Sequence, residues 1–241
     1  MFSTLQGEYF FRGDTQQINL SPGNMLYFSM AGDQIMVHSR LGHIGVFNKV
    51  ELVPIKEESL FQVRPLAPKL PARAYCDGIK VQPDFNRLLI INQVDFSHYL
   101  AGVVETEAGS SSGQEFYKAH AILCRTYAIK NMDRHIEEGF NLCDGTHCQA
   151  YKSYNRHNAA IYDAVKETDH KVVIYSEDST LITAAFHANS GGATYNSEDV
   201  WLEKLGYLRA IADPFSLKGR QASWTKTIDR NNWVQYLQKM V

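Results

Sequence analysis

The segment at residues 141–151, with the sequence NLCDGTHCQAY, brings together side chains that bind metals: Cys143, His147 and Cys148. Zn²⁺ accepts both thiolate and imidazole ligands. Cys143 and His147 have i, i+4 spacing, so both reach one ion if the segment is helical or tightly turned, whereas Cys148 joins them only if the turn bends back. The residues leave three interpretations open: a zinc site at Cys143 and His147, a Cys143–Cys148 disulfide, or neither.

A second group that could do chemistry is the pair Glu105 and Glu107, which follows the apolar run at residues 102–104. Cleavage of a glycosidic bond needs an acid that protonates the leaving oxygen. Two positions on a helix correspond to about 200° of rotation, so only one of the two carboxylates can face a given groove. Burial beside the apolar run would raise the pKa of that carboxyl toward neutrality, as a general acid requires.

The elements that must position these residues change along the chain. Residues 1–66 form short alternating apolar and polar runs broken by turn residues, which predicts β structure. A proline-rich segment at 65–71 predicts a crossing segment, and the helical spacing of apolar residues begins after Val94. We therefore expect an α+β fold, with a β-rich N-terminal subdomain at residues 1–66 and a mixed helix and hairpin part with a substrate groove at 67–241.

Two helix boundaries follow from local signals in the second part. Ser112 and Glu115 have the spacing of a capping box, which predicts a helix that starts there and runs to about Glu138. Asn155 or Asn158 is expected to cap a further helix.

The composition excludes some functional classes. The chain has 24 basic and 26 acidic residues, so no net positive charge recruits nucleic acid. The apolar runs are too short to span a bilayer, and the first residues lack the basic start and apolar core of a secretion signal. Four cysteines in 241 residues are too few for a disulfide scaffold. The composition therefore predicts a globular protein that neither binds nucleic acid through its net charge nor spans a membrane.

Four motifs in order give this chain a resemblance to the SpoIID/LytB (stage II sporulation protein D) family. They are the Tyr-Leu-x-Gly-Val-Val-x-x-Glu pattern, the Glu-x-x-Lys-Ala helix that ends in Arg-Thr-Tyr-Ala, the Asp-x-x-His-x-Gln-x-Tyr corner, and the Ser-Gly-Gly-x-Thr stretch. In this chain they stand at residues 99–107, 115–128, 144–151 and 190–194.

The resemblance implies a lytic transglycosylase that cleaves the MurNAc–GlcNAc bond of peptidoglycan glycan strands and leaves 1,6-anhydro-muramyl ends. It assigns the acid and base role to Glu107, and we expect Glu105 to face solvent. No cofactor is required for this chemistry, although the zinc site remains open. An exported location, in the periplasm or cell envelope, follows from the substrate, since the chain shows no signal or anchor. The alternative is a non-catalytic glycan-binding enhancer of an N-acetylmuramoyl-L-alanine amidase.

The other motif residues are expected to build the groove. Small residues at 190–194 allow a close approach of the backbone and offer hydroxyl groups, while an amide and an aromatic ring at 149 and 151 suit a polysaccharide. The substrate-binding residues predicted in this way are Arg125, His147, Gln149, Tyr151, Ser190, Gly191, Gly192 and Thr194. For Arg125 a buried structural role is an equal alternative.

This chain departs from the family pattern near the proposed acid. The family's Glu-Met-Pro reads Glu107-Ala108-Gly109 here, and its usual glutamine in the following helix is His120. The glycine loosens the backbone beside Glu107.

Overall fold

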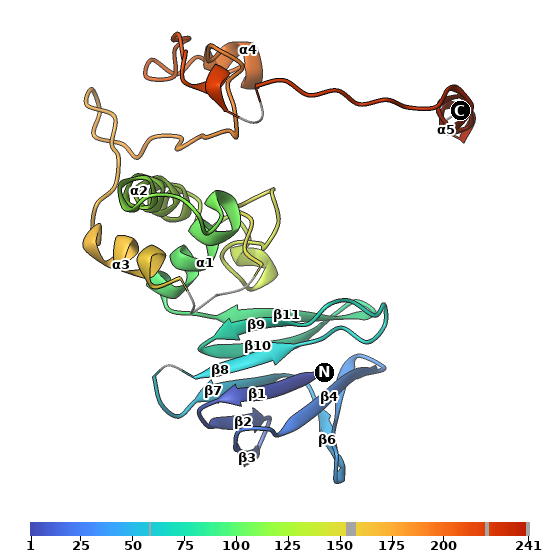
Figure 1. The fold of residues 1–241 in the computed structure, drawn as a ribbon. Helices are drawn as coiled ribbons and strands as arrows, with labels where there is room; N and C mark the ends of the chain where they lie inside the picture. Colours follow the sequence, from blue (N-terminus) through green and yellow to red (C-terminus); the bar gives the residue numbers. More distant parts are fainter. Residues whose placement is uncertain (58, 153–157, 220–221, 240–241) are drawn as a thin grey trace. The chain divides into compact units, whose positions relative to one another are not determined.

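The computed structural model describes residues 1–241 except 58, 153–157, 220–221 and 240–241. The chain divides into two compact units, Met1–Ala184 and Ala185–Val241. The first unit contains a β region and a helical region (Figure 1). The α+β class predicted from the sequence is confirmed.

The β region consists of two antiparallel sheets. The first has the order β6-β5-β4-β1-β8-β9, and the second has the order β11-β10-β7-β2-β3. The strands of the first sheet are β1 (Phe2–Gln6), β4 (Met25–Ala31), β5 (Gln34–Ser39), β6 (Gly42–Phe47), β8 (Leu60–Val63) and β9 (Arg73–Cys76). Those of the second are β2 (Tyr9–Gly13), β3 (Gln16–Leu20), β7 (Val50–Pro54), β10 (Gly78–Asp84) and β11 (Arg87–Gln93).

Alternation along these strands explains the core of the β region. In β5, Ile35 and Val37 are fully buried while their neighbours are partly exposed, as expected when side chains alternate across a sheet. Buried residues from both sheets, including Phe11 and Phe61, form one apolar cluster. The strands run past residue 66 to Gln93, and the predicted domain boundary between 66 and 67 stays a prediction.

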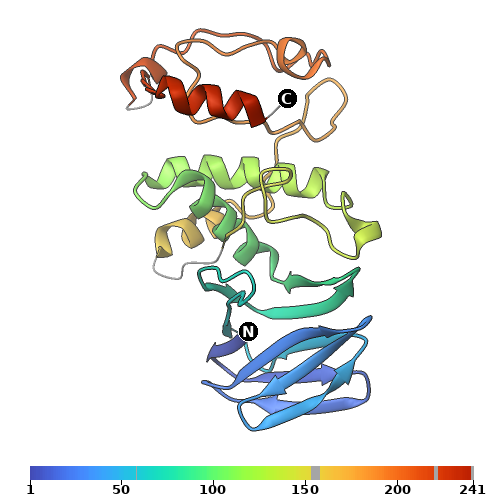
Figure 2. The same cartoon turned by 90° about the vertical axis from the view of Figure 1, so that its right-hand side faces the viewer.

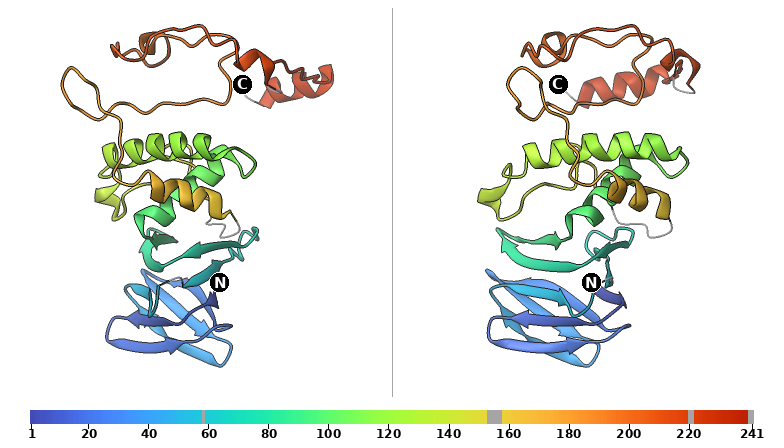
Figure 3. Two further views of the ribbon diagram at one scale, coloured as in Figure 1. Left: turned by 60° about the vertical axis from the view of Figure 1, so that its left-hand side comes forward. Right: turned by 90° about the vertical axis from the view of Figure 1, so that its left-hand side faces the viewer.

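The helical region follows β11 and has its own core. Helices α1 (Phe96–Ala108), α2 (Gln114–Lys130) and α3 (Ala159–Glu167) pack against one another, as Figures 2 and 3 show. The side chain of Asp95 caps α1 by accepting hydrogen bonds from the N–H groups of Ser97 and His98. Tyr75 packs against the cores of both regions.

Two boundary predictions in this region are wrong. Helix α2 has Gly113 as its N-cap and no side-chain cap. The Ser112 N–H, which a capping box would bond to the Glu115 side chain, instead donates to the Tyr117 hydroxyl at 2.8 Å. The helix ends at Lys130, where the Asn131 side chain donates back to the Tyr127 carbonyl. A short 3₁₀ helix, η1 (Ile136–Glu138), follows separately.

Helix α3 starts directly after Asn158, as predicted, but the Asn158 side chain makes no capping hydrogen bond. Asn155, the other candidate cap, lies outside the described residues. The second unit contains α4 (Ser197–Trp201), η2 (Ser216–Lys218) and α5 (Arg230–Lys239). Among the described residues, no helix has the length and apolar character needed to cross a membrane.

Candidate functional site

Glu107 lies in the last turn of α1, and its side chain is exposed rather than buried, so the expected burial is wrong. Its Oε1 accepts a hydrogen bond of 2.8 Å from the Ala150 N–H. This bond joins the end of α1 to the 143–151 loop. Glu105 is partly buried, not solvent-facing as expected.

Buried polar side chains lie beside this contact. Gln149 is 2% exposed, and its Oε1 accepts from the Tyr99 hydroxyl at 3.4 Å. Its Nε2 is buried and has no hydrogen-bond acceptor within the described part of the chain. His120 on α2 is also buried, and burial lowers the pKa of its imidazole, an effect that the Glu107 carboxylate opposes. Glu107 therefore lies near a second titratable group.

Four potential metal ligands converge at the start of the same loop. One ligand atom from each of His135, Cys143, His147 and Cys148 lies within 4.8 Å of all the others. The Nδ1 of His147 is 3.9 Å from the Cys143 Sγ and 3.8 Å from the Cys148 Sγ. In a tetrahedral zinc site, sulfur and nitrogen ligands are about 3.5 Å apart, given bonds of about 2.3 and 2.0 Å. The four residues fit a zinc ion with small adjustments.

The surroundings of the cluster also suit a metal. Nδ1 of His135 donates to the Glu138 carboxylate at 2.5 Å, which leaves the buried Nε2 as the ligand atom. A carboxylate that orients a ligating histidine in this way is typical of zinc sites. Burial raises the pKa of the Cys143 thiol, but hydrogen bonds with the Gly145 backbone, His147 and Cys148 outweigh it and lower the pKa to about 7. A thiol with this pKa is readily deprotonated to the form that binds metals.

The sequence analysis missed His135. It falls inside the stretch that was predicted to be helical up to Glu138, and the turn that directs it toward the loop exists only because α2 ends early. Arg134 helps to hold this turn, since its Nη1 donates to the His147 carbonyl at 2.8 Å. The possible disulfide is not formed, because all four cysteines are free thiols.

Arg125 has the structural role that was the alternative to substrate binding. It is 3% exposed, and its guanidinium donates to the carbonyls of Val165, Thr168 and Lys171 at 2.9, 2.8 and 3.2 Å. These carbonyls lie at and beyond the C-terminal end of α3, where backbone acceptors lack helical partners. The predicted contact of Arg125 with substrate therefore has no support.

Tyr151 is also more buried than a sugar-stacking ring should be. It is 5% exposed, and its hydroxyl donates to the Asn92 Oδ1 at 2.8 Å. Its ring lies in an aromatic cluster with Tyr75 and Tyr99, and it contributes to the wall of a cavity of about 810 Å³ beside β11. Glu107 is not among the residues that line this cavity.

The predicted Ser190–Thr194 stretch belongs to the second unit, where its hydroxyl groups hold the chain together. The Ser190 Oγ donates to the Asp213 Oδ2 at 2.7 Å, and the Thr194 Oγ1 accepts from the Ile211 N–H at 3.0 Å. Gly191 and Gly192 have positive φ values of 71° and 109°, which favour glycine. The prediction that this stretch shares one cleft with Glu107 stays a prediction.

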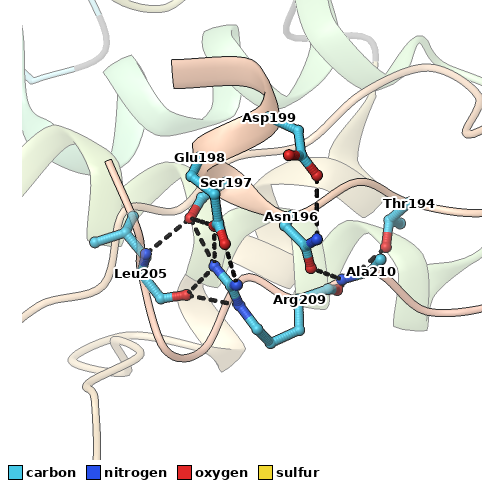
Figure 4. A network of polar contacts seen from close by, with 8 residues as sticks. All are labelled: Thr194, Asn196, Ser197, Glu198, Asp199, Leu205, Arg209 and Ala210. Carbon is cyan, nitrogen blue, oxygen red and sulfur yellow. Dashed lines mark hydrogen bonds and ion pairs between the residues drawn. The ribbon is translucent and has the colours of Figure 1, made fainter. Parts of the chain in front are cut away.

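A polar network next to this stretch joins side chains and backbone groups between residues 194 and 210 (Figure 4). Arg209 donates to both carboxylate oxygens of Glu198, to the Ser197 hydroxyl and to the Leu205 carbonyl. The Arg209 side chain, through its hydrogen bonds, holds the pKa of Glu198 at about 2.

Comparisons with known proteins agree with the motif pattern. Residues 84–175 match the family model described as Stage II sporulation protein (SpoIID). The chain is 34% identical over 131 residues to the amidase enhancer of Bacillus subtilis strain 168, which covers 54% of this chain and 17% of that protein. It is 27% identical over 162 residues to stage II sporulation protein D of the same strain, which covers 61% of this chain and 47% of that protein. The chain thus spans less than half the length of these curated relatives.

Proposed function

Because residues 84–175 belong to the SpoIID family, we propose that the protein acts at the bacterial cell wall as a peptidoglycan lytic transglycosylase with Glu107 as its acid and base. The observation that carries the proposal is the placement of the Glu107 carboxylate. One oxygen is held by the Ala150 N–H, whereas the side chain as a whole remains exposed. Among the described residues, Oε2 has no hydrogen-bond partner, so it is available to a substrate oxygen.

One carboxyl group suffices for this reaction. The Glu107 carboxyl donates its proton to the glycosidic oxygen, the bond from that oxygen to C1 of the muramyl sugar breaks, and positive charge develops at C1. The resulting carboxylate then takes the proton of the same sugar's 6-hydroxyl while O6 bonds to C1. The product is a 1,6-anhydro ring, and no water is consumed. Because Glu107 is exposed, a glycan strand can reach its carboxyl group from solvent.

The decisive experiment identifies the ends of cleaved strands. Purified glycan strands, with and without stem peptides, are incubated with the protein and analysed by mass spectrometry. Anhydro-muramyl ends are lighter by one water than the reducing ends left by a hydrolase. Glu107→Gln keeps the side-chain shape and the Ala150 contact but cannot transfer the proton, so the rate should fall on the order of 10² to 10⁴. Glu105→Gln, two positions away, is the matched control and should retain activity.

A second candidate function is the enhancement of a cell-wall amidase without cleavage of glycan. The observation in its favour is the 34% identity with the amidase enhancer. Unchanged strands in the cleavage assay, together with faster release of stem peptides when an N-acetylmuramoyl-L-alanine amidase is added, would establish this function and remove the transglycosylase. In either case the substrate is an exported polymer, so we propose an exported location.

We also propose that His135, Cys143, His147 and Cys148 hold one zinc ion. An ion with two thiolate and two imidazole ligands has no open position, which is typical of a structural site. Its role would be to fix the loop that presents the Ala150 N–H to Glu107. Protein purified without chelator should contain about one zinc per chain by elemental analysis. The Cys143→Ser/His147→Ala variant should contain none, and metal-free wild-type protein with full activity would contradict the proposal.

A further inference from the structure

A second cavity lies wholly within the second unit. It has a volume of about 580 Å³, within the range of about 300–1,000 Å³ that is usual for small-molecule sites. One wall is the turn at Asn189, Ser190 and Gly191, and the other is the segment that ends in Trp224. The tertiary structure thus adds an aromatic ring to a turn that the sequence analysis considered alone.

The turn side of the cavity is held in shape by internal hydrogen bonds. The Asn189 Nδ2 donates to the Ser216 carbonyl at 2.8 Å, and the Asn189 Oδ1 accepts from the Gly191 N–H at 2.7 Å. The Ser190 hydroxyl is bonded to Asp213 and Ser216. Because these side chains are already fixed, a ligand meets a preformed surface and orders little of the protein when it binds.

The opposite wall presents an exposed aromatic surface. Trp224 is 82% exposed, compared with 55% for Trp201 and 47% for Trp233, the other two tryptophans of the chain. An indole ring combines a large apolar face with an N–H donor at its edge, and exposed rings of this kind are common at binding sites. Trp224 therefore offers a flat platform beside a polar turn.

The lining indicates the chemistry of the ligand. None of the residues around the cavity carries a charge: apart from the indole, they offer two alanines, a glycine, two serines and an asparagine. Such a lining has no charged partner for a phosphate, a carboxylate or a metal ion. It is also too polar for a purely apolar molecule. A pyranose ring fits both walls, since its C–H face packs on an aromatic ring and its hydroxyl or acetamido groups bond to peptide groups at the rim.

We infer that this cavity is a sugar-binding subsite in which Trp224 stacks on an N-acetylated pyranose beside the 189–191 turn. The inference rests on the proposed function for the identity of the polymer, and it concerns binding rather than cleavage. Through this subsite, the second unit would bind the glycan strand.

The test uses tryptophan fluorescence of the full chain. In the Trp201→Phe/Trp233→Phe variant, Trp224 is the sole tryptophan and reports on its own surroundings. Titration with a GlcNAc–MurNAc tetrasaccharide without peptides should change its emission in a saturable manner. In the wild-type background, calorimetry with the same tetrasaccharide should give binding that is about tenfold weaker for Trp224→Ala. Trp224→Phe should retain most of the affinity, and Trp201→Ala is the matched control.

The outcomes separate this inference from the proposed function. Equal affinity of wild type and Trp224→Ala, or no binding of the tetrasaccharide by folded wild type, overturns the subsite. If binding depends on Trp224 while no anhydro ends are formed, the subsite stands and the transglycosylase falls. Circular dichroism of each variant shows that it is folded, so a loss of affinity can be assigned to the ring.

Discussion

The 143–151 loop of the first unit and the 189–194 stretch of the second unit are both rich in polar residues, but they use them in opposite ways. In the first, the Cys143, His147 and Cys148 side chains point their ligand atoms at one another and at His135. In the second, the Ser190 and Thr194 hydroxyls are bonded to their own unit. The first therefore supplies reactive atoms, whereas the second supplies a shaped backbone surface.

This comparison teaches that side-chain type alone does not assign a role. Ser190, which stands beside two glycines, was expected to bind sugar with its hydroxyl. That hydroxyl instead donates to the Asp213 carboxylate, so it has a structural role within its own unit. A group that lacks a partner is more informative. His135 Nε2 is such a group within the described residues. It indicates that His135 belongs to the proposed metal site, which the sequence pattern had assigned to Cys143 and His147.

The largest expected effect comes from removal of the proposed zinc. Treatment with a chelator should destabilise the first unit and leave the second unaffected. An ion present at about a thousand times its dissociation constant contributes roughly 4 kcal/mol. Hydrogen exchange followed by mass spectrometry should show lost protection at residues 135–151 and unchanged protection at 190–213. His38→Ala, on the β region and outside the cluster, should respond to chelator as wild type does. Equal loss of protection in both units would contradict the expected difference between them.

The next largest effect concerns one arginine in each unit, the buried Arg125 and the partly buried Arg209. Arg125→Met leaves the carbonyls of Val165, Thr168 and Lys171 without their donor, so the free energy of unfolding should fall by about 3 kcal/mol. Urea unfolding measures this loss. Arg209→Met should cost less, because a third of its side chain is exposed and solvent can replace the lost bonds. A larger loss of unfolding free energy for Arg209→Met than for Arg125→Met would contradict this ranking of the two arginines.

A smaller effect is expected from Ser190→Ala. The change removes the hydrogen bond to Asp213 but leaves the glycine backbone in place, so the cost should be about 1 kcal/mol. Hydrogen exchange of the 189–192 segment should accelerate, while glycan affinity falls only slightly. If affinity is instead abolished with exchange unchanged, the hydroxyl binds the sugar directly, and the division between reactive loop and shaped surface is wrong.

The smallest effect is the pH dependence of stability that the Glu198–Arg209 pair contributes to the second unit. The hydrogen bonds from Arg209 lower the pKa of Glu198 from an ordinary value of 4.5 to about 2. Because the pKa in the folded state is depressed, the contribution to stability is present above about 4.5 and is lost as the pH falls toward 2. Thermal unfolding between pH 5 and 2 should show this loss in wild type. In Glu198→Gln the same pH range should have a weaker effect, and an equal slope would exclude the pair as its source.

Much of the fold could be predicted from the sequence. Alternation predicted the β region because side chains of a strand alternate between core and surface, as Ile35 and Val37 do. Helical spacing after Val94 predicted α1 and α2, and Asn158, one of the two candidate caps, directly precedes α3. The motif order predicted a resemblance to the SpoIID family, and residues 84–175 match that family's model.

Local signals failed where a short-range side-chain hydrogen bond competed with them. The capping box at Ser112 was displaced when the Ser112 N–H found the Tyr117 hydroxyl, and the α2 helix stopped at Lys130 when Asn131 bonded back to Tyr127. Both outcomes depend on side-chain hydrogen bonds that periodicity does not report. The early end of α2 then placed His135 at the cluster.

By itself, then, the sequence determined the fold class, the resemblance to the SpoIID family, the places of Glu107 and His147 in its motifs, and the presence of Cys143 beside the corner motif. Only the tertiary structure decided which atoms meet. It turned Arg125 toward the end of α3, brought His135 to the two thiols and joined Trp224 to the 189–191 turn. The physical reason is that spacing along a chain fixes the direction of side chains within one element, whereas a site is assembled from several elements whose approach depends on packing.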